Sequence, residues 1–137
     1  MNPAIVGGVD SLCGSVLFGF NALGLVSQQP CLPFDTRRDG LSLGEAGGYA
    51  LLERLDDESR GLRLCGYGES SDAHHMSTPH PEGLGARLAM QEALMRAGID
   101  ADAVGYLNLH GTATPANDTI EASAVRGLFG ERLHASS

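Results

Sequence analysis

The chain has 137 residues, enough for one domain with a core of its own. Hydrophobic residues make up 42% of it and its 19 glycines follow no repeat, which indicates a folded protein with tight turns, and no run is long and apolar enough to span a bilayer. The formal net charge of −8, with nine Lys and Arg residues that form no cluster, argues against nucleic acid as a partner.

The first half of the chain predicts two strands around a helix. Residues 4–10 (AIVGGVD) read as a short buried strand that runs into a turn. Residues 12–27 are apolar nearly all round and predict a buried helix. A loop dense in proline and charge follows at 28–40, and residues 46–55 predict a central strand.

The second half begins with another predicted strand, at residues 63–72, and a loop at 73–83 that contains two prolines. Residues 84–97 then predict a helix, which ends at Gly98 in the position that glycine favours just past a helix C-terminus.

The last third predicts a strand, a helix and the beginning of a further strand. The strand covers residues 104–110, the helix runs from Asp118 to about Leu128, and the closing residues 133–137 have strand character. Strands that alternate with helices predict an α/β fold. Because its last predicted strand is cut short, the chain is interpreted as a fragment.

The stretch 107–118, LNLHGTATPAND, raises the question of chemistry. His110 stands at the predicted end of a strand, where α/β sheets bind ligands. Gly111 permits close approach, and Thr112 and Thr114 place two hydroxyls on alternate positions, a pattern suited to an extended, amide-rich ligand beside a histidine that donates to an oxyanion. The alternative is a turn histidine with threonine hydroxyls that cap the following helix, and the spacing leaves both open.

Glu121 also has two interpretations. Asp118-Thr-Ile-Glu121 is a capping-box pattern, in which the acid at the third helical position hydrogen-bonds back to the N-cap backbone. This pattern favours the cap, although a cap and a functional role can coexist.

Cys13 stands among small residues before a predicted helix, where the helix dipole would lower a thiol pKa. The apolar run that follows favours a cysteine in the core instead. Cys31 and Cys65 have no activating neighbour and are interpreted as structural. Three cysteines without metal-like spacing, and an N-terminus without a secretion signal, indicate the cytoplasm.

His74, His75 and His80 suggest a metal site at first sight. Their spacing matches no standard zinc pattern and no cysteine or acid is placed to complete four ligands. We therefore predict no metal and interpret them as loop histidines near a pocket.

Several motifs together resemble the β-ketoacyl-acyl-carrier-protein synthases, the condensing enzymes of fatty-acid and polyketide assembly. LNLHGTATPAND followed by Glu121 resembles the family's HGT-x-T-P-x-x-D-x-x-E segment. Residues 33–53 resemble its P-F-D-x-x-R-D-G segment and 66–79 its G-x-G-x-S-S-D-A-x-H-M-T-x-P loop, while 20–27 is similar to its acyl-pocket helix. The matches are collinear over essentially the whole chain and imply part of the thiolase-like layered αβαβα fold.

The resemblance implies a role for each matching residue. His110 would be the first of two histidines in a Cys-His-His triad, and would donate a hydrogen bond to the thioester carbonyl and to the enolate formed on decarboxylation. Thr112 and Thr114 would hold the phosphopantetheine arm of a carrier protein. The remaining roles are the acyl-pocket gate for Phe20, positions near the arm for His75 and Ser77, and pairing with a lysine beyond residue 137 for Glu121.

The same resemblance places the nucleophilic cysteine before Met1, so that Cys13 is not the nucleophile, and the second histidine after Ser137. The chain would then be a central fragment, from the end of the N-terminal half (about 1–60) to the start of the C-terminal half (about 61–137). The parent would need no cofactor, because phosphopantetheine arrives on acyl carrier protein, and would form a homodimer or heterodimer.

Two other hypotheses remain. The parent could be a non-catalytic partner subunit of the chain-length-factor type. The isolated chain, with one triad member, would be inactive and would expose strand edges and apolar helix faces through which it associates.

Overall fold

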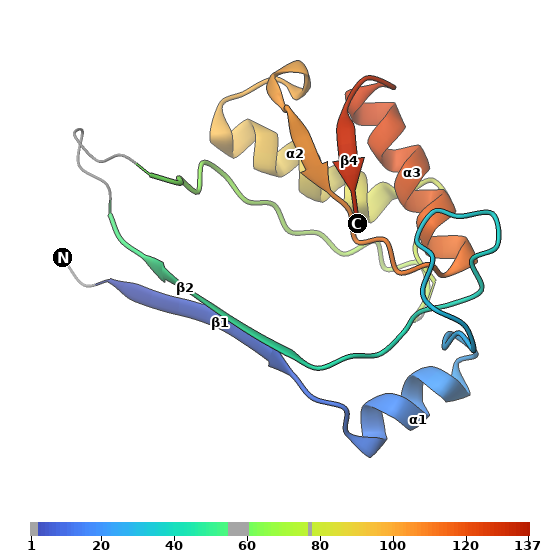
Figure 1. Cartoon of the computed structure of the whole chain (residues 1–137). Helices are drawn as coiled ribbons and strands as arrows, with labels where there is room; N and C mark the ends of the chain where they lie inside the picture. The colour runs from blue at the N-terminus through green and yellow to red at the C-terminus, as the bar shows by residue number, and fades with distance from the viewer. Residues whose placement is uncertain (1–2, 55–60, 77) are drawn as a thin grey trace.

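A computed structural model of the chain describes residues 3–54, 61–76 and 78–137. It shows a long two-stranded arm that ends in a helix, and beside it a compact group of helices and short strands (Figure 1). The mixed α/β class predicted from the sequence is confirmed.

The arm consists of β1 (Ala4–Asp10) and β2 (Ala46–Leu52), which pair antiparallel from Ala4 opposite Leu52 to Asp10 opposite Ala46. Gly7 is required here because the Tyr49 ring lies over it and would overlap a Cβ. β2 was predicted as a central strand, but within the described residues its one partner is β1, so that prediction is wrong.

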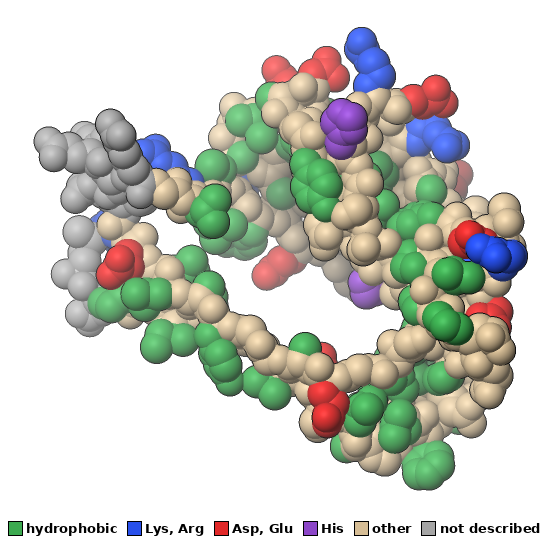
Figure 2. Space-filling view, viewed as in Figure 1, with side chains coloured by type: hydrophobic (Ala, Val, Ile, Leu, Met, Phe, Trp, Pro, Cys, Tyr) green, Lys and Arg blue, Asp and Glu red, His purple; other side chains and the backbone are tan. Residues whose placement is uncertain are grey.

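The helix after β1 is α1 (Gly14–Ala22), shorter than the predicted 12–27. Its residues were expected to be buried, yet Phe18 is 77% exposed. Figure 2 shows hydrophobic side chains gathered along the arm and over α1. The expected exposure of apolar faces is thus confirmed. The expected burial of this helix is not confirmed in the described part of the chain.

The compact group contains five elements: α2 (Leu84–Ala97), the 3-10 turn η1 (Ala101–Ala103), β3 (Tyr106–Asn108), α3 (Pro115–Phe129) and β4 (His134–Ser136). β3 and β4 are parallel, and α3 is the crossover helix that parallel strands need. β3 is shorter than the predicted 104–110, and β4 lies where residues 133–137 predicted a strand. Among the described helices, none combines the length and apolarity needed to cross a membrane.

Two helix boundaries show how local sequence acts. α2 ends at Gly98, as predicted, with a left-handed φ of 67°. α3 begins at Pro115 rather than at the predicted Asp118, because proline favours the first helical position and Thr114 takes the N-cap place.

Residues 63–72, predicted as a strand, form an extended segment without a strand partner among the described residues. The segment lies along α2, where a Cβ on Gly66 or Gly68 would overlap the backbone at Ala93 or Ala89. These two glycines allow the segment and the backbone of α2 to approach closely. The side chain of Ser70 donates to Gly85 O at 2.6 Å and secures the contact.

Among the described residues other than glycine, the most buried lie where the His110 turn meets α3. Ala113 is fully buried, Asp118 is 1% exposed, and Ala124 and Thr114 are 4% and 8% exposed. The loop that the sequence marks as functional is therefore the best-packed part of the described chain.

Candidate functional site

His110 lies just beyond the C-terminal end of β3. Leu109 N donates to Ser136 O at 2.7 Å, which extends the parallel pairing by one residue, and Gly111 then turns the chain with a φ of 51°. His110 is exposed, and no described side chain hydrogen-bonds to its imidazole. The predicted strand-end position is confirmed, with the ring accessible for chemistry.

The Glu121 carboxylate holds the backbone of this turn. Its Oε1 accepts the N–H of His110 at 2.7 Å and its Oε2 accepts the N–H of Gly111 at 3.0 Å. The capping-box prediction is wrong, because α3 begins at Pro115 and Glu121 lies in its second turn rather than at its third residue. Glu121 instead fixes the direction in which the chain leaves the strand.

Thr112 and Thr114 face one another, with their Oγ1 atoms 2.9 Å apart. Thr114 has the N-cap position of α3 but makes no side-chain capping hydrogen bond. The alternative in which these hydroxyls cap the helix is therefore wrong. The pair forms a small polar feature one residue past Gly111.

Three residues whose role was not predicted from the sequence support this turn. Asp118 accepts the N–H of Ala113 at 3.1 Å and that of Phe34 at 2.7 Å, and Arg38 Nε lies 3.8 Å from its Oδ2. The one available signal was that Phe34, Arg38 and Asp118 all fall inside recognisable motifs. Nothing in those motifs says that they meet across about eighty residues.

The other predicted site residues lie apart from the turn. Phe20 is on α1 and lines an apolar hollow of about 500 Å³ with Ser15, Val16, Gly19 and Leu23. Within the described ranges, no hydrogen bond joins this hollow to His110. His75 is exposed in the 73–83 loop, and Ser77 lies outside the described residues.

That loop is organised by Asp72, which accepts the backbone N–H groups of His74 at 3.0 Å and His80 at 2.9 Å. The hydrogen bond from His80, followed by that from His74, lowers the pKa of the Asp72 carboxyl. The rings of His74 and His80 meet edge to face at 5.1 Å. Among the described residues, no group of three or more His, Cys, Asp or Glu is arranged to hold a metal.

Cys13 is exposed at the N-cap of α1, so the predicted core position is wrong. Its Sγ lies 3.1 Å from Ser15 Oγ, and this hydrogen bond lowers the thiol pKa. Cys65 is exposed, whereas Cys31 is half-buried with its Sγ 3.8 Å from Thr112 O. Cys31 thus lies against the turn that contains His110.

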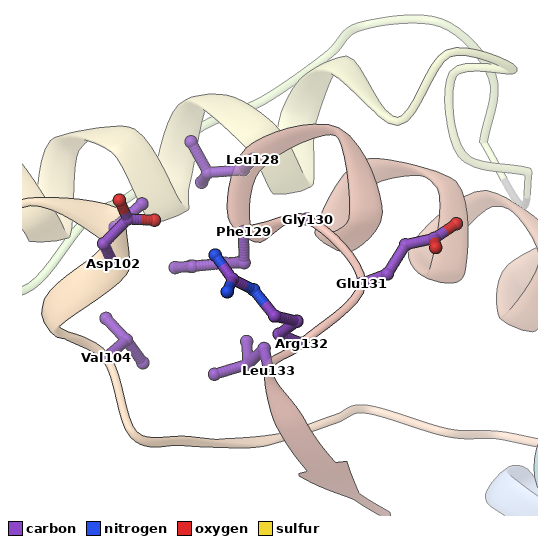
Figure 3. Close-up of a pocket in the computed structure, with 9 residues that line it drawn as sticks. Asp102, Val104, Leu128, Phe129, Gly130, Glu131, Arg132 and Leu133 are labelled. Atoms are coloured by element: carbon purple, nitrogen blue, oxygen red, sulfur yellow. The ribbon is translucent and has the colours of Figure 1, made fainter.

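A separate pocket of about 430 Å³ lies between η1 and the C-terminal end of α3 (Figure 3). Its walls include Val104 and Leu133, which precede the two parallel strands, so it lies at the end of the strands opposite His110. Figure 3 shows the Arg132 side chain extending between Asp102 and Glu131. The pocket contains none of the predicted site residues.

Known proteins resemble this chain over most of its length. It is 38% identical over 138 aligned residues to 3-oxoacyl-[acyl-carrier-protein] synthase 2 of Staphylococcus aureus, which covers 93% of this chain and 34% of that protein. It is 43% identical over 115 residues to the mitochondrial 3-oxoacyl-[acyl-carrier-protein] synthase of Arabidopsis thaliana, covering 80% of this chain and 24% of that protein. The chain thus spans about a third or less of these relatives.

Solved structures agree. A chain of the complex between a ketosynthase and its chain length factor, from Xenorhabdus doucetiae, superposes with a TM-score of 0.93 at 47% identity, covering 98% of this chain and 33% of that one. The α/β fold is accordingly that of the thiolase-like ketosynthases.

Two family models match the sequence. The N-terminal domain of β-ketoacyl synthases matches residues 2–58, and the C-terminal domain matches residues 63–137. Together with the relatives, they show that this chain belongs to the β-ketoacyl synthase family.

Proposed function

We propose that the chain is the central part of a 3-oxoacyl-acyl-carrier-protein synthase that performs a decarboxylative Claisen condensation. In this reaction an acyl group is carried on an enzyme cysteine. The malonyl group of a carrier protein loses CO₂, and the enolate left behind attacks the acyl carbonyl and expels the cysteine thiolate. The observation that supports this most directly is the exposed His110 ring beyond β3, on a backbone that Glu121 fixes.

His110 supplies a hydrogen bond to the thioester oxygen, where negative charge appears as CO₂ departs. A neutral imidazole donates from one ring nitrogen, and a donor held in place stabilises the enolate more than the ground state. The fixed backbone of the turn matters because it holds the imidazole in place before the reaction. A donor that first had to move into position would stabilise the enolate less.

Thr112 and Thr114 bind the phosphopantetheine arm. The arm carries two amides, and two adjacent hydroxyls can donate to and accept from such groups. Their position past Gly111, on the same turn as His110, supports an arrangement in which the arm is held while its thioester reaches the imidazole. His75 and Ser77 contribute further contacts to the arm from the 73–83 loop.

Phe20 gates the acyl pocket, in line with its position on the apolar hollow of α1. The cysteine nucleophile and the second histidine come from parts of the protein beyond these 137 residues, and Cys13 is not the nucleophile. Glu121, besides holding the turn, pairs with a lysine from one of those parts.

The partners we propose are acyl carrier protein and a second ketosynthase-type subunit, as homodimer or heterodimer. The names of the relatives include the carrier protein, and the similar solved chain comes from a two-subunit complex. No cofactor is needed beyond the phosphopantetheine on the carrier. The cytoplasm is the proposed location.

The test is His110→Ala in the full-length protein, with CO₂ release from malonyl carrier protein as the readout. We expect the rate to fall by about 10²- to 10³-fold, the usual effect of losing one oxyanion donor. His134→Ala is the matched control, since His134 is an exposed histidine at the start of β4. Unchanged decarboxylation in His110→Ala would show the assigned role to be wrong.

A second candidate is a non-catalytic partner subunit of the chain-length-factor type. The similarity to a chain of a ketosynthase–chain length factor complex supports this second candidate. The two candidates differ in one covalent intermediate. Mass spectrometry of the full-length protein after incubation with an acyl carrier thioester should show an acyl-cysteine for the enzyme and none for the partner subunit.

A further inference from the structure

The inference concerns Asp118, the one fully buried large side chain among the described residues, to which the proposed function gives no role. It is 1% exposed, and its two oxygens accept backbone N–H groups from distant parts of the chain: Oδ2 from Phe34 at 2.7 Å and Oδ1 from Ala113 at 3.1 Å. Burying a carboxylate costs free energy unless it is hydrogen-bonded. Losing either of these two hydrogen bonds would therefore destabilise the folded chain.

Both donor residues have a positive φ, a backbone conformation that residues other than glycine rarely adopt. φ is 59° at Phe34 and 60° at Ala113, and Ala73 is the one other described non-glycine residue with a positive φ. Such a conformation persists where the surroundings impose it. Here the surroundings include one shared acceptor, so a single carboxylate constrains two unusual backbone positions.

Arg38 also lies beside Asp118. Its guanidinium donates to Asp35 O at 3.0 Å, to Thr119 Oγ1 at 2.7 Å and to Pro115 O at 3.1 Å, and its Nε lies 3.8 Å from Asp118 Oδ2. Arg38 thus ties its own loop to the first turn of α3 and places a positive charge beside the buried carboxylate.

The consequence falls on the threonine pair. Ala113 lies between Thr112 and Thr114, whose hydroxyls are 2.9 Å apart, so the backbone angles at Ala113 decide whether the two hydroxyls meet. We infer that Asp118, with Arg38 beside it, is a positioning residue that fixes Thr112 and Thr114 for the carrier arm. This inference rests on the proposed function.

Two carboxylates on α3 have different roles. Glu121 holds His110 and Gly111, and Asp118 holds Ala113. Loss of Asp118 should therefore weaken arm binding, seen in KM, whereas loss of Glu121 should slow decarboxylation, seen in kcat.

The test compares Asp118→Asn with wild type in the full-length protein, with malonyl carrier protein as the substrate. The two N–H groups bond to different oxygens, and in asparagine one of these oxygens becomes an NH2 group, so one N–H loses its acceptor. We expect KM to rise by about tenfold, the effect of one lost hydrogen bond to a charged group, and kcat to change by less than about twofold. Ala124→Gly is the control: it weakens the same helix at a buried position without touching the carboxylate.

A rescue variant tests the mechanism itself. Glycine adopts a positive φ without strain, so Ala113→Gly added to Asp118→Asn should restore much of the lost affinity. A fall in kcat at constant KM, the same KM change in Ala124→Gly, or a double variant no better than Asp118→Asn would each overturn the inference. If Asp118→Asn does not fold, Arg38→Gln replaces it with the same expectation for KM.

A measurement without activity keeps the inference separate from the proposed function. Amide hydrogen exchange of Asp118→Asn should become faster at Phe34 and Ala113 and stay unchanged at His110 and Gly111. Unchanged exchange at Phe34 and Ala113 would overturn the positioning role. Faster exchange at those two residues, in a protein that does not decarboxylate, would support the hydrogen bonds that Asp118 accepts from Phe34 and Ala113. It would contradict the proposed function alone.

Discussion

Glu121 reaches back from the second turn of α3 and accepts the backbone N–H of His110 at 2.7 Å. A side chain inside a helix thereby sets the path of the chain as it leaves β3, and the His110 ring projects from a backbone that cannot rotate freely. This relationship makes an acid, eleven residues further along the chain, part of the geometry of the histidine.

The first prediction is that Glu121→Gln slows catalysis more than it weakens binding. The amide has one oxygen for two N–H donors, and losing a hydrogen bond to a charged acceptor costs about 1.5–3 kcal/mol. We expect kcat for decarboxylation in the full-length protein to fall by about ten- to a hundredfold. Glu131→Gln, at an exposed acid just past the same helix, should have no effect. Equal effects from both variants would contradict the role of Glu121.

The second prediction concerns the packing of residues 63–72 on α2. In Gly68→Ala the new methyl group would overlap the backbone of Ala89, so we expect the free energy of unfolding to fall by about 1–3 kcal/mol. Gly127→Ala is the matched control with the opposite sign. Gly127 lies in α3 with open space around it, and alanine should stabilise the helix by about 0.5–1 kcal/mol. Urea unfolding of both variants measures the two values, and a neutral Gly68→Ala would exclude the close packing.

The third prediction is that the chain associates through its arm. Ile5 and Tyr49 lie on the β1–β2 pair and are 77% and 73% exposed. Apolar faces and unpaired strand edges promote association. Light scattering coupled to size-exclusion chromatography should show oligomers that Ile5→Lys combined with Tyr49→Lys reduces. Met76→Lys, at an exposed methionine away from the arm strands, should not reduce them. A well-folded wild-type monomer would contradict the prediction.

The fourth prediction is a pH titration. The hydrogen bond from the Arg37 side chain lowers the pKa of Asp35 from 3.8 to about 2. Because the folded pKa is depressed, the stabilisation is fully present above pH 3.8 and is lost as the pH falls towards 2. NMR titration of the Asp35 carboxyl should show this pKa, and Arg37→Ala should raise it towards 3.8. Arg126→Ala should leave it unchanged, since Arg126 pairs with Glu131.

Local sequence determined much of this protein. Residues 84–97 and the glycine that follows them predicted the helix that became α2, and β-strand preference placed His110 at the end of β3. The motifs around His110 were sufficient to indicate the family. Each of these signals depends on residues a few positions apart, whose local backbone preferences follow from their own chemistry.

Tertiary structure decided the rest. Asp118 meets Phe34 across 84 positions, and no spacing rule encodes which buried carboxylate will satisfy which backbone N–H. Glu121 fits a capping box by its sequence, but Pro115 starts the helix earlier and turns the acid towards His110 instead. Residues 63–72 have strand composition, yet they lie against α2 without a strand partner among the described residues. Sequence specifies local conformation, whereas hydrogen-bond partners far apart in the chain are chosen by packing, because a buried polar group must find its partner among the groups that the fold brings near.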